Sequence, residues 1–161
     1  MHKEFIYIFL GLIVGGLIFS IQSSVVYNAT PSFPIGFYRL RSSFSESDVV
    51  WFDVPGDVER LVFHRNYIPS GGKLMKKIIA VEGDRWCVTD RSMVIDGIVV
   101  GHIRTEDSRG LPLPQLPEGC NALGPDELIV VSNHPLSFDS RYFGPVKRSA
   151  VKGSLEELWI W

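Results

Sequence analysis

An uncharged, largely apolar stretch near the start of the chain sets the first limit on how it can fold. No charged residue occurs between Glu4 and Arg39, and the run from Phe5 to Ile21 is apolar apart from Ser20. Because a helix needs about 20 mostly apolar residues to cross a bilayer, this run is long enough to span a membrane with modest tilt. The sequence therefore predicts a single membrane anchor over residues 1–26 and a separate domain over residues 27–161.

The charges around this run predict on which side of the membrane the domain lies. Lys3 and the terminal amine precede the run, and no Lys or Arg follows it until Arg39. The positive-inside rule then keeps the N-terminus in the cytoplasm and exports the domain. A cleaved signal peptide is the alternative, since Ser20–Ser24 or Asn28–Ala29 weakly resemble a cleavage site. We favour an uncleaved anchor, because such a cleavage would fall beside the Ser32 segment described below.

The composition excludes several classes of function. The 161 residues carry a formal net charge of −2 and no block of Lys or Arg, which argues against binding to nucleic acid. Cys87 and Cys120 are the two cysteines and lack C-x-x-C spacing, and no nucleotide-binding motif occurs, so we expect no metal and no other cofactor. In an exported domain these cysteines would pair as a disulfide, whereas in the cytosol they would remain two buried thiols.

Residues 27–161 predict a mainly β fold. Short runs rich in strand-forming residues alternate with turn residues. These runs are Asp48–Phe52, Lys77–Val81, Leu128–Ser132 and Leu158–Trp161. Asp96-Gly97, between two apolar runs, predicts a two-residue hairpin turn. Apolar residues at helical spacing predict one helix over Asp57–Asn66.

Two features lie outside this pattern. Between about residues 101 and 125 the strand signals disappear and four prolines occur. We expect this Pro-rich excursion to decorate the core without a catalytic group, pinned by a Cys87–Cys120 bridge. The terminal tryptophans, Trp159 and Trp161, suit either a membrane interface or a strand-packing site, and we expect the second.

A serine between two prolines is the first candidate for chemistry. Ser32 lies between Pro31 and Pro34, just after the anchor. Because proline fixes φ and biases the preceding residue towards extended conformations, we expect a stiff, extended segment with a turn at Gly36. Such a segment would hold the Ser32 hydroxyl in a fixed place near the membrane, and a Ser/Pro linker is the plainer alternative.

A lysine is the candidate base for that serine. The four histidines are scattered, and no spacing pairs one of them with a serine and an aspartate. A lysine can act as a base only if burial lowers its pKa from about 10.4 by several units. In a strand Lys76 shares a face with Leu74 and Ile78, Lys77 lies on the other face, and periodicity does not choose between the two lysines. The alternative is that both amines reach solvent.

Three segments of the chain form an ordered set, Ser32–Tyr38, Met75–Asp84 and Ser137–Pro145. In this order, and behind an anchor, they resemble the type I signal peptidase superfamily. They look most like its conjugative-transfer branch, the TraF-type peptidases. That branch has an Asn-x-Thr-x-Ser-x-Pro-x-Gly-x-Tyr pattern, whose fixed positions match Asn28, Thr30, Ser32, Pro34, Gly36 and Tyr38. His64–Gly72 resembles a further segment of the branch.

The resemblance implies catalytic roles for four residues. Ser32 matches the nucleophile, and Lys76, the first lysine of its pair, matches the general base. Ser137 matches the serine that hydrogen-bonds and orients the lysine amine. Thr30 and the backbone N–H of Ser32 match the two donors that stabilise the oxyanion.

The resemblance also implies supporting residues. Asp139 and Arg141 match a pair that supports the site, although an ion pair there is equally explained by holding the fold. Gly83 and Asp84 match a structural turn. Phe33, in place of the usual methionine, departs from the general signal peptidases, and Val131–Pro135 replaces their Gly-Asp-Asn-Arg-Asp sequence. Both departures favour a specialised substrate.

The function implied is cleavage of an exported precursor by a Ser/Lys serine endopeptidase. The family has a signal-peptidase-like catalytic domain in the periplasm, anchored by a single pass in the bacterial inner membrane. Its TraF branch implies a pilin-like substrate, resolution of the acyl-enzyme by water or by an amine in cyclisation, and contact with a conjugation or secretion apparatus.

Three alternatives are weighed against this function. A general leader peptidase would cleave many secreted proteins rather than one pilin-like precursor. A non-catalytic assembly subunit of the transfer apparatus would need no active site, and the joint presence of Ser32, Lys76 and Ser137 argues against it. A self-cleaving repressor of the related Ser/Lys type does not fit the anchor or the lack of a DNA-binding segment.

Overall fold

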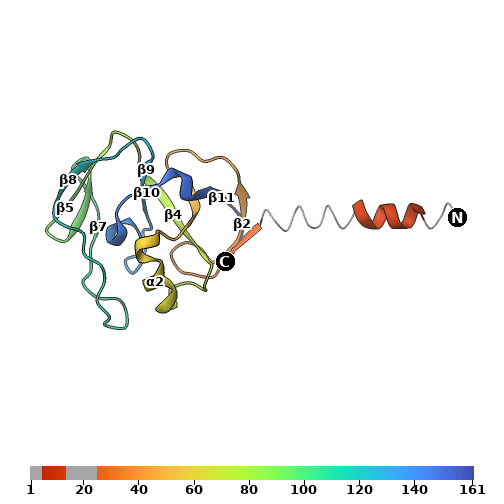
Figure 1. The fold of residues 1–161 in the computed structure, drawn as a ribbon, viewed down its shortest axis with the longest axis horizontal. Coiled ribbons are helices and arrows are strands. Elements are labelled where there is room, and N and C mark those ends of the chain that lie inside the picture. Colours follow the sequence, from red (N-terminus) through yellow and green to blue (C-terminus); the bar gives the residue numbers. More distant parts are fainter. Residues whose placement is uncertain (1–4, 14–24) are drawn as a thin grey trace.

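The computed structural model describes residues 5–13 and 25–161 of the chain. Residues 5–13 are helical, and the other parts of the predicted anchor, residues 1–4 and 14–24, lie outside the described residues. None of the described helices is long and apolar enough to cross a membrane. From Val25 onward the chain forms the mainly β domain that the sequence predicts (Figure 1).

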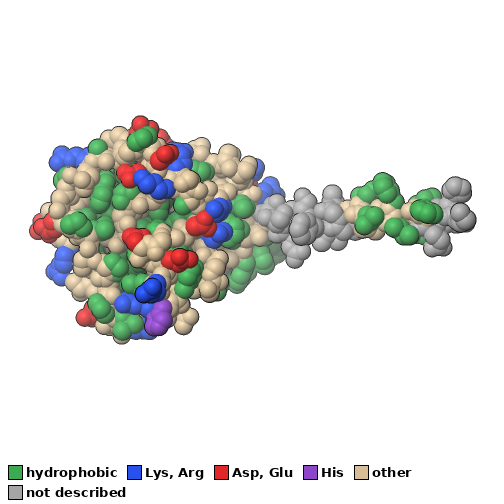
Figure 2. Space-filling view, viewed as in Figure 1, with side chains coloured by type: hydrophobic (Ala, Val, Ile, Leu, Met, Phe, Trp, Pro, Cys, Tyr) green, Lys and Arg blue, Asp and Glu red, His purple; other side chains and the backbone are tan. Residues whose placement is uncertain are grey.

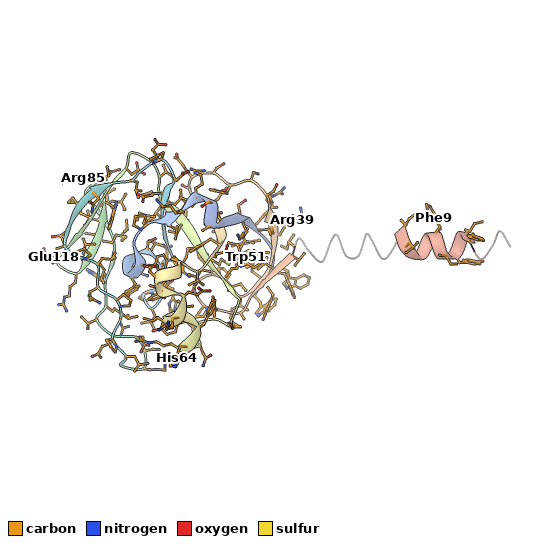
Figure 3. All side chains as sticks on the ribbon, viewed as in Figure 1. Phe9, Arg39, Trp51, His64, Arg85 and Glu118 are labelled. Carbon is orange, nitrogen blue, oxygen red and sulfur yellow. A yellow bond between two sulfur atoms is a disulfide. The ribbon has the colours of Figure 1, made fainter. Side chains whose placement is uncertain are left out.

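Antiparallel pairing joins the strands into two sheets (Figure 1). The larger sheet has seven strands in the order β1-β2-β11-β3-β4-β9-β10, which are Val25–Asn28, Gly36–Arg41, Val151–Ile160, Val49–Asp53, Lys73–Ala80, Glu127–Val131 and Val146–Lys147. The smaller sheet has four strands in the order β7-β6-β5-β8, which are Ile98–His102, Ser92–Ile95, Arg85–Thr89 and Gly119–Ala122. Figure 3 places the smaller sheet, marked by Arg85 and Glu118, at the far end of the domain from Arg39.

Helices are few and short in the described domain. They are α2 (Gly56–His64), α3 (Ser140–Phe143) and the 3₁₀-helix η1 (Arg148–Ala150). Helix α2 packs Val58 and Val62 onto buried residues of the larger sheet such as Phe52. Because the apolar residues of a strand alternate between faces, this packing specifies the register of the central strands.

Strand β4 runs through the middle of the larger sheet, between β3 and β9. Its Leu74 and Ile78 belong to the core beneath α2, and its Met75 packs in a second cluster with Tyr38 and Leu155. Both faces of the strand are therefore covered near residue 76. A side chain at that position has little freedom to move.

The local predictions for strands, hairpin and helix are confirmed. The predicted helix over residues 57–66 corresponds to α2, and the four predicted runs overlap β3, β4, β9 and β11. The turn between β6 and β7 lies at Asp96 and Gly97, with Ile95 paired to Ile98. Both turn residues have positive φ, 47° and 84°, as a type I′ turn requires.

The Pro-rich excursion is more ordered than predicted. Strand β8 lies within it and pairs with β5, which brings Cys120 opposite Cys87, and the two form the expected disulfide. A strand therefore lies in a segment whose sequence carries no regular strand signal. All four β8 residues are exposed, so the segment has no apolar alternation by which it could be recognised.

The expectation that the terminal tryptophans fill a strand-packing site is also wrong. Trp159 is 70% exposed and Trp161 is 65% exposed. The end of β11 pairs only with β2, because its pairing with β3 stops at Ser154. This corner of the sheet lies beyond the layers that cover its centre, so the indole rings have no core to enter.

Candidate active site

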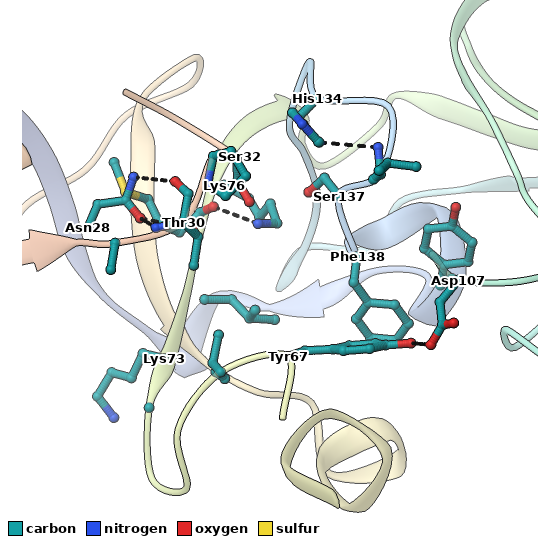
Figure 4. Close-up of a pocket in the computed structure, with 18 of the residues that line it drawn as sticks. Asn28, Thr30, Ser32, Tyr67, Lys73, Lys76, Asp107, His134, Ser137 and Phe138 are labelled. Atoms are coloured by element: carbon teal, nitrogen blue, oxygen red, sulfur yellow. Dashed lines mark hydrogen bonds between the residues drawn. The ribbon is translucent and has the colours of Figure 1, made fainter. Parts of the chain in front are cut away.

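A pocket of about 670 Å³ brings together segments that are far apart in the sequence (Figure 4). Its walls come from the β1–β2 loop, from β4, from the loop between β9 and α3, and from the Pro-rich excursion. Ser32, Lys76 and Ser137 all line it. The three residues that the resemblance assigns to the chemistry therefore meet at one cavity.

Ser32 lies in the loop between β1 and β2, and Asn28 shapes that loop. The Asn28 Nδ2 donates to the carbonyl oxygens of Thr30, Phe33 and Pro34, at 2.9, 3.1 and 3.0 Å. Its Oδ1 accepts hydrogen bonds from the backbone N–H and the hydroxyl of Thr30, at 3.1 and 2.9 Å. Residues 31 and 32 form a turn. The predicted extended segment is wrong, because these bonds outweigh the local preference imposed by proline.

The end of the loop is closed by Tyr38. This buried side chain donates its hydroxyl to the carbonyl of Pro34, at 2.6 Å, and burial raises its pKa. Gly36 is not the predicted turn but the first residue of β2. It has a φ of +156°, and an added Cβ would overlap the backbone of Trp159, so glycine is needed for β11 to approach.

Lys76, not Lys77, is the buried lysine of the pair. Lys76 is 3% exposed, whereas Lys77 is exposed to solvent. Burial lowers the pKa of Lys76 from 10.5 to about 8; the charge of Asp139 opposes this shift and that of Arg141 adds to it. Its Nζ donates to the carbonyl of Met75 at 2.9 Å. The structure thus makes the choice that periodicity left open.

Ser137 lies in the same pocket with an unused hydroxyl. Its Oγ is buried and has no hydrogen-bond partner among the described residues. No hydrogen bond joins the side chains of Ser32, Lys76 and Ser137 in this substrate-free form of the described chain. Catalytic hydrogen bonds are often long in free enzymes and shorten when substrate binds.

A buried ion pair holds the loop that carries Ser137. The Arg141 Nε and Nη2 donate to Asp139 Oδ1 and Oδ2, both at 2.8 Å, and the two side chains are 4% and 0% exposed. The same Nη2 donates to the carbonyls of His134 and Ser137, at 3.3 and 3.2 Å. The pair therefore orders the loop that carries Ser137, which both a role in supporting the site and a purely structural role require.

Ser132 contributes a contact that the sequence analysis missed. Its Oγ donates to the carbonyl oxygen of Ser32 at 2.6 Å, across 100 residues of sequence. Its backbone N–H donates to Asp139 Oδ2 at 3.2 Å. In the sequence, Ser132 belongs to the Val131–Pro135 segment, which differs from that of the general signal peptidases. Nothing in the sequence indicates that its side chain bonds to Ser32.

The Pro-rich excursion forms one wall of the pocket and does not merely decorate the core. Arg104, Glu106, Asp107, Ser108 and Leu113 line the cavity. Tyr67, at the end of the α2 region, donates its hydroxyl to Asp107 Oδ2 at 2.6 Å, and this bond is the main reason that the pKa of Asp107 falls to about 2. Tyr67 also packs against Phe138, the neighbour of Ser137. The excursion therefore shapes the pocket as well as covering the core.

Gly83 and Asp84 lie outside the pocket. They form the turn between β4 and β5, where Gly83 has a φ of +89° and Asp84 Oδ2 accepts a hydrogen bond from Val81 N at 2.8 Å. The Cys87–Cys120 disulfide lies in the smaller sheet. Within residues 5–13 and 25–161 no cluster of His, Cys, Asp or Glu is arranged to hold a metal ion.

Comparison with known proteins identifies the family. The family described as "Signal peptidase, peptidase S26" matches residues 2–161, and the chain belongs to it. Plasmid transfer protein TraF of Escherichia coli is 31% identical over 147 residues, which cover 83% of this chain and 82% of that protein. Conjugal transfer protein TraF of Agrobacterium fabrum strain C58 is 30% identical over 169 residues, covering 95% of this chain and 94% of that protein.

Among solved structures, a signal peptidase I from Enterococcus faecalis V583 aligns with 70% of this chain and 96% of its own. The TM-score is 0.39 and the sequence identity is 21%. This likeness is too low to carry an argument about the site.

The buried amine of Lys76 should cost the fold stability at neutral pH. Between about pH 8 and 10.5 the unfolded chain holds the Lys76 proton and the folded chain does not, so the free energy of unfolding rises with pH in this window. Below it, the folded state carries the full penalty of a buried charge. We expect Lys76→Met to raise the free energy of unfolding at pH 7 by about 3 kcal/mol, with a gain that shrinks towards pH 10.

Urea denaturation of wild type, Lys76→Met and Lys77→Met at pH 7 and pH 10 measures this effect. The exposed Lys77 serves as the matched control and should leave stability almost unchanged. Equal effects of the two substitutions would contradict a penalty specific to Lys76.

Proposed function

We propose that this protein is a membrane-anchored serine endopeptidase in which Ser32 is the nucleophile and Lys76 is the general base. One observation carries the proposal. A lysine that is 3% exposed, with a pKa lowered to about 8, lines the same pocket as Ser32. Burial is how proteins make a lysine neutral enough to activate a serine.

The first chemical step forms the acyl-enzyme. The neutral Nζ of Lys76 leaves the Met75 carbonyl and takes the proton of the Ser32 hydroxyl as its oxygen attacks the scissile carbonyl. The unpartnered Oγ of Ser137 then serves as the acceptor that orients the lysine amine. When the tetrahedral intermediate collapses, Lys76 returns the proton to the leaving amine.

Two donors stabilise the oxyanion in this mechanism. They are the backbone N–H of Ser32 and the hydroxyl of Thr30, each typically worth about 3 kcal/mol. In the free form the Thr30 hydroxyl donates to Asn28 Oδ1. It must therefore turn away from Asn28 when substrate binds. Water, or an amine if the product is cyclic, then releases the acyl group from Ser32.

The free edge of β4 suits an extended substrate. On the β9 side, β4 is paired at Lys77, Ile78 and Ala80, and no described strand pairs with this edge from Lys73 to Lys76. This unpaired edge lies on the wall of the pocket. Unpaired backbone groups at a sheet edge bind a peptide by adding it as a further strand.

The relatives suggest what the substrate is. Both TraF proteins are named for plasmid or conjugal transfer. By this similarity the substrate is an exported, pilin-like precursor, and the partners are components of a conjugation or secretion apparatus. The enzyme would then act from the bacterial inner membrane, with its catalytic domain in the periplasm.

Cleavage of such a precursor tests the dyad. Co-expression of the candidate pilin precursor with wild type should shorten it, whereas Ser32→Ala and Lys76→Met should leave it intact, because one lacks the nucleophile and the other the base. Lys77→Met, at the exposed neighbour, should cleave as wild type does. Mass spectrometry of the precursor measures the outcome and separates a linear product from a cyclic one.

Cleavage retained by Lys76→Met would rule out the Ser/Lys assignment. Trimming of unrelated secretory precursors at similar rates would instead indicate a general leader peptidase. Failure of the wild type to cut either substrate would favour a non-catalytic assembly subunit.

The pH dependence of cleavage should follow Lys76. Only the neutral amine accepts a proton, so kcat/KM should fall about tenfold for each pH unit below about 8 and level off above it. Initial rates on a peptide spanning the cleavage site, measured from pH 6 to 9.5, give this profile. A profile that levels off well below pH 8 would contradict Lys76 as the base, and His134, which also lines the pocket, would be the next candidate.

An exposed aromatic cluster supports the placement at a membrane. Tyr27, Phe37 and Trp161 lie with ring centroids 5.2 to 6.1 Å apart, and Trp159 is the next aromatic residue along β11. Figure 2 shows hydrophobic side chains gathered on this side of the domain, next to the start of β1. Tyrosine and tryptophan concentrate at the interface between lipid and water.

The tryptophans of this cluster should contact lipid headgroups in the reconstituted full-length protein. Brominated lipids should quench part of the tryptophan fluorescence, and the double variant W159F/W161F should lose that quenched part, since Trp51 and Trp86 remain. Equal fractional quenching in the variant and the wild type would show that these tryptophans do not contact lipid, and the cluster would then give no support to placement at a membrane.

A further inference from the structure

The loop that presents Ser32 is held from two sides, by groups to which neither the family resemblance nor the mechanism above gives a role. Asn28 holds it from within, and Ser132, the first residue after strand β9, holds it from the other side. Both side chains are almost fully buried, at 7% and 3% exposed. A buried polar side chain is costly unless its hydrogen bonds are made, and these two make theirs to the nucleophile loop.

The pattern of bonds at Asn28 needs an amide. The three carbonyls of Thr30, Phe33 and Pro34 converge on Nδ2, while the N–H of Thr30 points at Oδ1. Asparagine supplies donors and an acceptor on one short side chain. An aspartate of the same shape would keep the acceptor but would set a carboxylate oxygen against three carbonyl oxygens.

The bond from Ser132 ties the loop to the rest of the site. Its Oγ holds the carbonyl of Ser32 itself, while its N–H is held by Asp139, the partner of Arg141. Arg141 in turn holds the carbonyl of Ser137. A continuous chain of hydrogen bonds therefore runs from the nucleophile loop to the loop that faces Lys76.

We propose that Asn28 and Ser132 are positioning residues that set the place of the Ser32 hydroxyl relative to Lys76. This inference rests on the proposed function. Displacement of a reacting group by about 1 Å can lower a rate by about 100-fold. Loss of either anchor should therefore act on the chemical step, with little effect on substrate binding along β4.

The hydrogen bond between Thr30 and Asn28 allows two roles of Thr30 to be distinguished, which are holding the loop and donating to the oxyanion. In the free protein its hydroxyl belongs to the Asn28 anchor. If Thr30 acts only through this anchor, Thr30→Val loosens the loop as a change at Asn28 does. If it serves chiefly as an oxyanion donor, Thr30→Val slows catalysis while the loop keeps its order.

The experiment compares Asn28→Asp, Asn28→Ala, Ser132→Ala and the conservative Ser132→Thr in the full-length, detergent-solubilised protein. Asn133→Ala is the matched control, because Asn133 is exposed beside Ser132. Two quantities are measured: kcat and KM on a precursor peptide, and hydrogen–deuterium exchange of the peptide segment covering residues 29–35. The second does not depend on activity.

We expect the two Asn28 variants and Ser132→Ala to lose about 100-fold in kcat with KM little changed, and to exchange faster in residues 29–35 alone. Ser132→Thr keeps a hydroxyl and should recover most of the kcat, and Asn133→Ala should match the wild type. Unchanged exchange in residues 29–35, or a loss that falls on KM, would overturn the proposal. Faster exchange confined to this loop in a protein whose wild type cleaves nothing would support the anchoring and overturn the proposed function instead.

Discussion

The burial of one lysine amine is the constraint around which the domain is arranged. Lys76 lies in the central strand of the larger sheet, where packing on both faces leaves its side chain 3% exposed. The free energy of that burial disfavours the charged amine and lowers the pKa to about 8. The fold thus accepts a penalty in stability at the position where the proposed mechanism needs a neutral base, a common trade between stability and activity.

Hydrogen bonds hold the two loops that carry the remaining parts of the site, and one of these bonds spans 100 residues of sequence. The Ser32 loop is anchored by Asn28 and Ser132, and the Ser137 loop by the Asp139–Arg141 pair. Because Ser132 and Asp139 are themselves bonded, the two loops form one network. Buried networks of this kind are rigid when every member is satisfied, and the Ser137 hydroxyl, which is buried without a partner among the described residues, lines the pocket.

The Pro-rich excursion gives the pocket its outer wall, and its order comes from contacts at both ends. Tyr67 binds Asp107 near the tip, and the disulfide at Cys120 ties the returning strand to the smaller sheet. Backbone hydrogen bonds from Leu113 to Thr105 and from Asp107 to Leu111 also pair its two arms. The pocket is therefore shared between the larger sheet, its loops and this excursion, and its shape depends on a segment that has little regular structure of its own.

Features that depend on neighbouring residues could be read from the sequence, and features that depend on distant ones could not. The β fold, helix α2, the turn at Asp96 and Gly97 and the three family segments follow from local propensity, periodicity and motif order. The burial of Lys76 rather than Lys77, the bent Ser32 loop, the bond from Ser132 and the exposure of the terminal tryptophans depend on which surfaces meet. The alternation of a strand predicts which residues share a face but not which face is buried. A proline restricts its own φ, but it does not predict that the Asn28 side chain will bind the backbone carbonyls of the loop. Only the packed structure decides those, because burial and hydrogen bonding act between segments as far apart as residues 32 and 132.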